Sequence, residues 1–334
     1  MRKGICCAGN MIVDITYPTE GWPNQGELVH IHDGIARTTG GAVCNVAVDL
    51  AKLDPELPVF AMGRIGADAE GDLILKTMVA NGIDTSCIIQ EGISAFTLVM
   101  SDMRSKQRTF FTYLGANGLF SEADIDWDKV TANIFHIGYI LLLNALDQPD
   151  AEYGSKMARL LHAAQAHGLK TSIDVVSEAS DRFARLVPPA MKYTDYCIIN
   201  EYEAEMTTGV KLRGEAGELI EANLPAALQA MKDMGVSTWA VIHCPEGGFG
   251  LDEQGRFVRM GSLVLPEGYI KGSVGAGDAF CAGVLYGAEK GWTLERAIDL
   301  GIASAAASLS AAGATEGMCS QAEAMKLFEK YERR

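Results

Sequence analysis

The sequence predicts an α/β protein of three layers, in which helices cover both faces of a central, mainly parallel sheet and a small β-sheet lid lies beside it. Short apolar strand-like runs alternate with amphipathic helical stretches along most of the 334 residues, as in parallel sheets covered by helices. A glycine-rich turn between Lys271 and Glu289 leads into a helix of small residues. Two β-rich segments outside the alternation predict the lid. We expect a single domain, residues 1–334.

Composition narrows the classes of partner. Hydrophobic residues make up 48% and charged residues 21% of the chain, which is typical of a globular protein with a substantial core. The net charge of −15 argues against a nucleic-acid or acidic membrane surface as partner. An anionic ligand would then have to be held locally, by backbone amides, a metal ion or a few Lys and Arg side chains.

The cysteines and the N-terminal segment predict a cytoplasmic location. None of the eight cysteines forms a Cys-x-x-Cys pair, and most lie in apolar runs, so we expect reduced thiols. Arg2 and Lys3 are not followed by an adequate signal-peptide core, because Asp14 interrupts the apolar run. We also expect no membrane partner, since no uninterrupted apolar run is long enough to span a bilayer.

The first strand is expected from Gly4 to Ile15, a largely apolar run typical of a buried parallel strand. Asp14 would then lie at the carboxyl end of a central strand, where ligands bind in open α/β sheets. The alternative is a turn aspartate before Tyr17-Pro18.

The lid is expected from two insertions, at about residues 16–39 and 93–118. Short alternating pieces from Gly26 to Thr39 predict a small ribbon. Ser94 to Met103 and Arg108 to Leu114 are β-rich runs joined by a polar turn, which predicts a hairpin.

Gly40 and Gly41 lead into a helix that ends near Leu53, with Asn45 in its first turn. Two glycines let a small ligand approach the backbone. An amide side chain beside them suits a polyol, and a plain turn with a surface asparagine is the alternative.

The remaining elements follow the same alternation. Strands are expected at Val59–Met62, Ile134–Leu143, Leu169–Val176, Tyr196–Ile199, Trp239–Cys244 and Phe257–Val264; helices are expected up to Ala80 and at 151–167, 224–234 and 294–309; turns are expected at 115–118 and 245–250. Asp68 is expected to cap the helix that ends at Ala80.

Gly275, Ala276 and Gly277 are expected at the start of a helix, where unpaired amides and the helix dipole bind anions, phosphate above all. A carboxylate beside an anion site repels the anion unless chemistry needs it. Asp278 is therefore interpreted as a base that takes a proton from a hydroxyl while the amides stabilise a phosphoryl group. The alternative is that Asp278 caps the helix.

These residues resemble a known family. Gly275-Ala276-Gly277-Asp278 is similar to the C-terminal signature of the PfkB (ribokinase-like) carbohydrate kinases. The N-terminal signature of that family, Gly-Gly-x-x-x-Asn, matches at Gly40, Gly41 and Asn45. The resemblance covers nearly the whole chain in the family's order and implies a ribokinase-like fold.

The resemblance also implies roles. Asp278 would be the catalytic base, with the anion hole formed by Gly275, Ala276 and Gly277. The sugar would be contacted by Asp14, Gly40, Gly41, Asn45 and Asn117. ATP and Mg²⁺ would be held by Asn200, Glu203, Gly248, Gly275 and Gly277, with Glu203 as the metal carboxylate. For Asn200 and Glu203, a helix start with acids in its first turn is the alternative.

Some positions depart from the family pattern. Gly272 and Ser273 stand where the family often has Asp-Thr, which leaves potassium activation open. Ile12 replaces an asparagine common in ribokinases, so ribose is not implied. Ala42 disfavours a phosphorylated acceptor. The nucleotide turn keeps only Gly248.

The function expected is ATP-dependent phosphorylation of a hydroxyl on a sugar or sugar-like molecule. A nucleoside kinase of the same fold and a non-catalytic sugar sensor are the alternatives. A dinucleotide-dependent oxidoreductase and a Walker-type NTPase are excluded, because the chain lacks both glycine motifs. We expect a homodimer through the lid, since an open ribbon has edges and an apolar face to cover.

Overall fold

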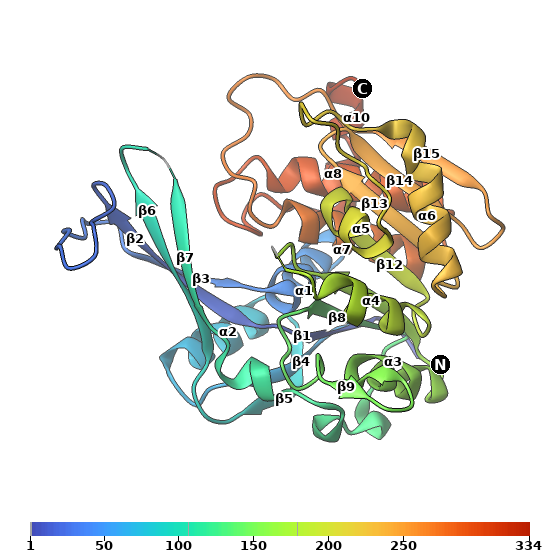
Figure 1. Cartoon of the computed structure of the whole chain (residues 1–334), viewed down its shortest axis with the longest axis horizontal. Coiled ribbons are helices and arrows are strands. Elements are labelled where there is room, and N and C mark those ends of the chain that lie inside the picture. Colours follow the sequence, from blue (N-terminus) through green and yellow to red (C-terminus); the bar gives the residue numbers. More distant parts are fainter. Residues whose placement is uncertain (1, 106, 179) are drawn as a thin grey trace.

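The structure is a computed structural model that describes residues 2–105, 107–178 and 180–334. Within these ranges a nine-stranded sheet forms the centre, in the order β15-β14-β13-β12-β11-β8-β1-β4-β5, with helices on both faces (Figure 1). Met1, the start of the predicted domain, and Lys106, in the predicted lid turn, lie outside the described residues.

The central sheet is mainly parallel, as predicted. The parallel strands are β1 (Ile5–Gly9), β4 (Val59–Ile65), β5 (Asp84–Gln90), β8 (Ile134–Ile140), β11 (Lys170–Val175), β12 (Tyr196–Asn200) and β13 (Trp239–Cys244). The antiparallel strands β14 (Gly247–Leu251) and β15 (Phe257–Gly261) complete one edge. The predicted turn at 245–250 is thus shorter than expected, because Gly247 to Gly250 form β14.

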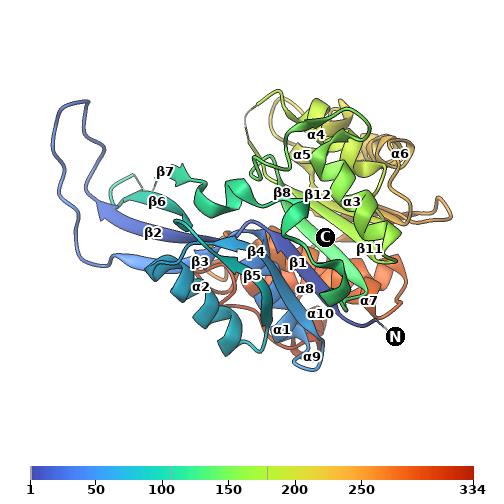
Figure 2. The ribbon, with the colours of Figure 1, turned by 90° about the horizontal axis from the view of Figure 1, so that it is seen from below.

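The helices form two layers, which Figure 2 shows on opposite sides of the sheet. One layer contains α1 (Ala42–Leu53), α2 (Ala69–Ala80), α7 (Ala276–Glu289), α8 (Leu294–Ser308), α9 (Gln321–Met325) and α10 (Leu327–Lys330). The other contains α3 (Lys156–Ala166), α4 (Phe183–Met191), α5 (Glu201–Thr208) and α6 (Leu224–Asp233). In the described part of the chain, no helix has the length and apolar character to cross a membrane.

Each helix layer covers its own hydrophobic core, and the strands divide their side chains between the two. Ile5 and Cys7 of β1 belong to the core under α1, α7 and α8. Cys6 and Ala8 belong to the core under α3, α4 and α6. Because side chains alternate along a strand, a strand buried on both faces must be apolar at every position, and β1 is. The three-layer arrangement follows.

A separate four-stranded sheet projects from the body at the blue and teal end of the molecule (Figure 1). Its order is β3 (Ala36–Gly40), β2 (Ile12–Thr19), β6 (Ala95–Asp102) and β7 (Arg108–Tyr113). The predicted hairpin is confirmed, since β6 and β7 pair antiparallel. That this sheet closes over the site as a lid remains a prediction.

The prediction of one strand from Gly4 to Ile15 is wrong. The chain forms two strands there, β1 in the central sheet and β2 in the small sheet. The apolar pattern conceals the break because Met11, between the two strands, is fully buried. Asp14 therefore lies inside β2, opposite Thr38 and Thr97, and not at the carboxyl end of a central strand.

Short elements account for the remaining differences from the sequence prediction. The segment 151–155 is not helical, because a small ribbon, β9 (Pro149–Asp150) with β10 (Gly154–Ser155), precedes α3. The predicted turn at 115–118 is the 3₁₀ helix η1 (Gly115–Leu119), and further 3₁₀ turns are η2 (Glu122–Asp124), η3 (Trp127–Lys129) and η4 (Glu221–Asn223). Asp68 caps α2 as predicted, accepting from the Gly71 amide. The eight cysteines are free thiols.

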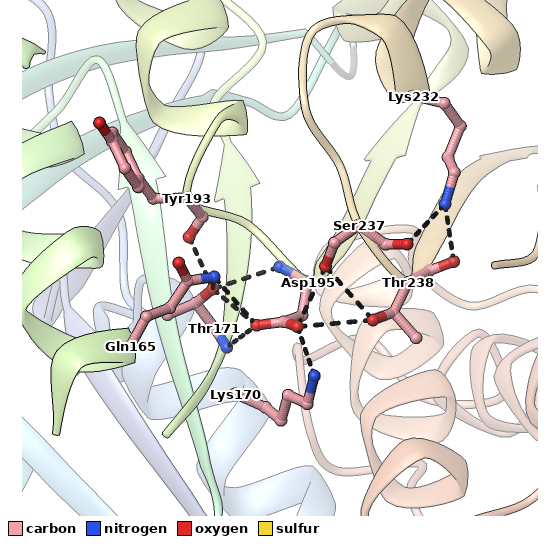
Figure 3. Close-up of polar contacts among 8 residues, drawn as sticks. All are labelled: Gln165, Lys170, Thr171, Tyr193, Asp195, Lys232, Ser237 and Thr238. Carbon is pink, nitrogen blue, oxygen red and sulfur yellow. Dashed lines mark hydrogen bonds and ion pairs between the residues drawn. The ribbon is translucent and has the colours of Figure 1, made fainter. Parts of the chain in front are cut away.

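A polar cluster around Asp195 ties together the amino ends of β11, β12 and β13 (Figure 3). The Asp195 carboxylate accepts hydrogen bonds from Lys170 Nζ at 2.7 Å and from the Thr171 amide at 2.9 Å. Gln165 and Ser237 donate to it as well. Burial alone would raise the pKa of Asp195, but these donors together hold it below the usual value. The cluster stabilises the end of the sheet opposite to the carboxyl ends of the strands.

We predict that Asp195→Ala lowers the free energy of unfolding by about 3–5 kcal/mol, because it leaves buried donors without their acceptor. Because the native pKa of Asp195 is lowered, its contribution to stability is complete above the unfolded pKa of about 3.9 and is lost as the pH falls through the native value. Urea unfolding at pH 7 and at acidic pH measures both effects. The control is Asp233→Ala, because Asp233 is an exposed residue of α6. An equal loss of unfolding free energy in the two variants would contradict the prediction.

Candidate active site

The candidate site lies at the carboxyl ends of β8, β11 and β12, where they meet the start of α7. A cavity of about 280 Å³ opens there. Its lining includes Tyr139, Asp174, Asn200, Glu203, Gly277 and Asp278. These residues come from five elements, β8, β11, β12, α5 (Glu201–Thr208) and α7. The carboxyl ends of parallel strands are where ligands bind in open α/β sheets.

The start of α7 has the form expected of an anion site. Gly275 is the N-cap residue, with a φ of 80° and no side chain to cap the helix. A Cβ at this position would lie 2.4 Å from the carbonyl oxygen of Ala314, so glycine is required both by its φ and by the space. The first amides of a helix have no partner within it. The Ala276 amide donates over a long 3.4 Å to the Ser273 carbonyl oxygen, whereas the amides of Gly277 and Asp278 have no acceptor among the described residues and are available to an anion.

Asp278 does not cap the helix, contrary to the alternative interpretation. Its carboxylate accepts from Tyr139 Oη at 2.7 Å and from Asn45 Nδ2 at 2.8 Å. The residue is only 7% exposed. Burial raises the pKa of Asp278 above the usual range, and the hydrogen bonds from Tyr139 and Asn45 oppose that rise. These are the conditions of a carboxylate that can act as a base near neutral pH.

The predicted sugar-binding residues gather beside Asp278. A Cβ on Gly40 would lie 2.6 Å from Asp14 Oδ2, so the Asp14 carboxylate lies directly over that glycine. Gly41, with a φ of 85°, is equally close to Asn10. Asn45, in the first turn of α1, donates a hydrogen bond to Asp278. Asp14 thus belongs to the same neighbourhood as Asp278, although it comes from the small sheet.

Asp14 and Asn117 differ in what they offer a ligand. Burial raises the pKa of Asp14 to about 6, opposed by Arg108 on β7, and the side chain keeps partial exposure. Asn117 is fully buried: its amide donates to the Met11 carbonyl oxygen at 2.8 Å and accepts from the Met11 amide at 3.3 Å. Asn117 therefore fixes the break between β1 and β2 in this structure.

Asn200 and Glu203 form a reciprocal cap at the start of α5. The Glu203 amide donates to Asn200 Oδ1 at 2.9 Å, and the Asn200 amide donates to Glu203 Oε2 at 3.0 Å. The alternative interpretation, that Asn200 and Glu203 form the start of a helix, is thus correct. Glu203 nevertheless lines the cavity, and burial raises its pKa to about 7.

Asp174, Glu203 and Asp278 place three carboxyl groups around one small cavity. Burial raises the pKa of Asp174 well above its usual value, and the charges of Glu203 and Asp278 raise it further. Carboxylates that destabilise one another fit a divalent cation, and Mg²⁺ prefers one or two such groups together with water and phosphate oxygens. Asp174 and Glu203 are the residues that could hold it.

A second, larger cavity of about 550 Å³ adjoins the first, and Asn200, His243 and Gly277 line both. Its wall is mostly apolar, with Leu263, Leu265, Ile270, Phe280, Ile302 and Leu309 among the lining residues. Gly247 lines this cavity, whereas the predicted Gly248 does not: a Cβ there would meet Phe280 and Ile298. Burial lowers the pKa of His243 to about 4, so the ring is neutral where it packs, tilted by 30°, against Phe280.

Tyr139 and Asp174 were not predicted as site residues. Both sit near the ends of apolar strands, β8 and β11, where an aromatic ring is typical of core packing. The sequence offers only a weak signal for these two residues, namely a polar group near the carboxyl end of a buried strand.

The chain matches the pfkB family of carbohydrate kinases over residues 2–321. The chain belongs to this family. It is therefore a phosphotransferase that acts on a sugar hydroxyl, and the predicted resemblance is confirmed.

Individual relatives agree with that assignment. The chain is 25% identical over 228 residues to a ribokinase of Staphylococcus aureus, covering 67% of this chain and 69% of the relative. It is 23% identical over 291 residues to a 5-dehydro-2-deoxygluconokinase of Geobacillus thermodenitrificans, covering 84% and 80%.

Solved structures confirm the ribokinase-like fold. Arabidopsis thaliana ribokinase, solved with ribose and ATP, aligns with a TM-score of 0.81 at 20% identity, over 98% of this chain and 99% of that chain. A nucleoside kinase of Methanocaldococcus jannaschii aligns with a TM-score of 0.75 at 18% identity, over 98% of both chains.

We predict that Gly275→Ala disrupts the start of α7. Gly291→Ala is the matched control, because Gly291 also has a positive φ, 66°, but no atom lies within 4 Å of its added Cβ. Both variants should lose about 1–2 kcal/mol of stability through backbone strain. Gly275→Ala should lose about 1–3 kcal/mol more through its clash with Ala314, and bind ADP at least about tenfold more weakly. Thermal unfolding and calorimetric titration measure the two effects. Equal behaviour of the variants would contradict the prediction.

Proposed function

We propose that this kinase transfers the γ-phosphoryl group of ATP to a hydroxyl of a sugar or sugar-like acceptor, with Asp278 as the general base. The observation that supports the proposal most strongly is the position of the Asp278 carboxylate. It is buried at the start of α7, next to the helix amides, and joined through Asn45 to the Gly40-Gly41 segment and Asp14.

The proposed reaction is an in-line displacement. Asp278 takes the proton of the acceptor hydroxyl while that oxygen forms a bond to the γ-phosphorus. The bond between this phosphorus and the β–γ bridging oxygen breaks, and ADP leaves. The amides after Gly275 stabilise the charge that develops on the transferred group. Glu203 and Asp174, near Asn200, would hold Mg²⁺, which would supply positive charge to offset that of the phosphates.

The two cavities suggest where each substrate binds. The larger, mostly apolar cavity suits a nucleoside, because its walls offer Phe280 and aliphatic side chains to a base. Gly277 lies at the junction with the smaller cavity, where phosphates would reach the start of α7. Ribokinases of the same fold solved with ATP and with ADP support the use of a nucleotide. Asp14, Gly40, Gly41 and Asn45 would hold the acceptor beyond Asp278.

The acceptor is proposed only as a class. The relatives named above include kinases of ribose and of 5-dehydro-2-deoxygluconate, and a nucleoside kinase shares the fold. An ADP-release screen across neutral sugars, sugar acids and nucleosides, run in sodium and in potassium buffers, separates these candidates. It also tests whether Gly272, in place of a family aspartate, abolishes potassium activation. A sugar sensor is disfavoured, since it has no use for a buried base.

We predict that Asp278→Asn lowers kcat by about 10²–10⁴-fold, because an amide cannot accept the acceptor's proton. The change is isosteric, so ATP and acceptor dissociation constants should stay within about threefold. Coupled ADP release and calorimetric titration measure these quantities, with Asp233→Asn as the exposed control. Near-normal turnover of Asp278→Asn would refute the role of the base.

We also propose a homodimer formed through the small sheet. Every residue of edge strand β7 is exposed, including Phe110, Phe111 and Tyr113. An edge strand with exposed aromatic side chains is a pairing surface unless it is covered. Light scattering should give the mass of two chains, and Phe111→Asp should shift it toward one. The control is Val79→Asp, at an exposed residue of α2, and it should leave the mass unchanged. A monomeric wild type would contradict the proposal.

A further inference from the structure

Asp49 is the most unusual ionisable residue outside the proposed mechanism. It lies in α1 with an exposure of 0%. Neither of its carboxylate oxygens has a hydrogen-bond partner in the part of the chain that the structure describes. An ionised carboxylate without donors is among the most costly groups to bury, so the group must be neutral or find a partner.

A candidate partner lies one helical turn earlier. Asn45 Nδ2 donates to Asp278, but Asn45 Oδ1 is buried and, among the described residues, has no donor. Residues four apart on a helix share a face, with Cβ atoms about 5–6 Å apart, and their side chains can form a hydrogen bond. Asn45 Oδ1, an acceptor without a donor, therefore lies one turn from the Asp49 carboxyl group, which needs a proton or a hydrogen-bond partner.

The surroundings decide which of the two carboxyl groups carries a proton. Asp278 accepts hydrogen bonds from Tyr139 and Asn45, whereas Asp49 accepts none from the residues that the structure describes. The charged groups facing Asp49 are Asp278 on α7 and Lys52 on its own helix. Lys52 directs its ammonium group to the Thr315 carbonyl oxygen, 2.7 Å away. Burial, and then the Asp278 charge, raise the pKa of Asp49 well above its usual value, opposed by Lys52.

We propose that Asp49 is a protonated positioning residue that donates a hydrogen bond to Asn45 Oδ1 and so fixes how Asn45 holds the catalytic base. With its oxygen engaged by Asp49, the Asn45 amide can present only its NH₂ group to Asp278. A rotated Asn45 would instead place its oxygen against the carboxylate. Asp49 thus acts on Asp278 through Asn45 and contacts no substrate. Its effect on turnover rests on the proposed function.

Two substitutions separate a hydrogen-bond donor from a charge. Asp49→Asn keeps a donor of the same shape, and Asp49→Leu fills similar space without one. In Asp49→Leu, Asn45 is no longer held with its NH₂ group toward Asp278, so we expect the pKa of Asp278 to rise. The acidic limb of log kcat against pH should then shift to higher pH by about 0.5–1 unit. Its kcat at neutral pH should fall more than its acceptor KM changes. In Asp49→Asn both the limb and kcat should return close to wild type.

Tyr139→Phe calibrates the shift, because it removes the other donor to Asp278 directly and should move the limb in the same direction. An Asp49→Asn variant as impaired as Asp49→Leu would overturn the proposal, since it would show that Asp49 acts through its charge. An unshifted limb in Asp49→Leu would overturn it as well.

A measurement without substrate keeps the inference separate from the proposed function. The infrared difference spectrum between wild type and Asp49→Asn at pH 7 should contain the C=O stretch of a protonated carboxylic acid. Subtraction removes the shared contributions of Asp174 and Glu203. Absence of the band would overturn the proposal even if Asp49→Leu fails to fold. If Asp278→Asn remained active, the proposed function would fail while the band still reported the protonation of Asp49.

Discussion

The site depends on one carboxylate held by two donors. Asp278 receives hydrogen bonds from Tyr139 at the end of β8 and from Asn45 in the first turn of α1. These contacts join three elements that are far apart in the sequence, and they set the direction of the carboxylate relative to the amides of α7. Burial raises the pKa of the Asp278 carboxyl group, and the hydrogen bonds from the two donors oppose that rise. The proposed anion site and the proposed acceptor site meet at this side chain.

The two ends of the central sheet have opposite electrostatic characters. At the amino end, Asp195 is surrounded by donors and a lysine, so its charge stabilises the fold. At the carboxyl end, burial raises the pKa of Asp174 and of Glu203, and the charge of Asp278 raises both further, which costs stability until a cation binds. Favourable charge pairing is thus concentrated at the end of the sheet away from the proposed site, and electrostatic strain is concentrated where chemistry is proposed.

The parts of the site within one short segment were predictable from sequence. Gly40, Gly41 and Asn45 form one turn, as do Gly275 and Asp278, because their roles follow from local backbone geometry. The contact of Tyr139 with Asp278 spans two distant segments and leaves no local pattern. Asp14 was assigned to the wrong sheet because the apolar pattern does not reveal the break at Met11. Gly248 was assigned from the family's nucleotide turn. The structure places Gly247 in the lining of the larger cavity, and adjacent residues of a strand face opposite sides.

The central claim is that Asp278 faces both the acceptor hydroxyl and the phosphate held by α7. The most direct test is a crystal structure with an acceptor that the enzyme phosphorylates and a non-hydrolysable ATP analogue. The account predicts an acceptor hydroxyl within about 2.6–3.2 Å of an Asp278 oxygen, and γ-phosphate oxygens within hydrogen-bond distance of the amides after Gly275. An acceptor bound away from Asp278, or phosphates that avoid the start of α7, would contradict it.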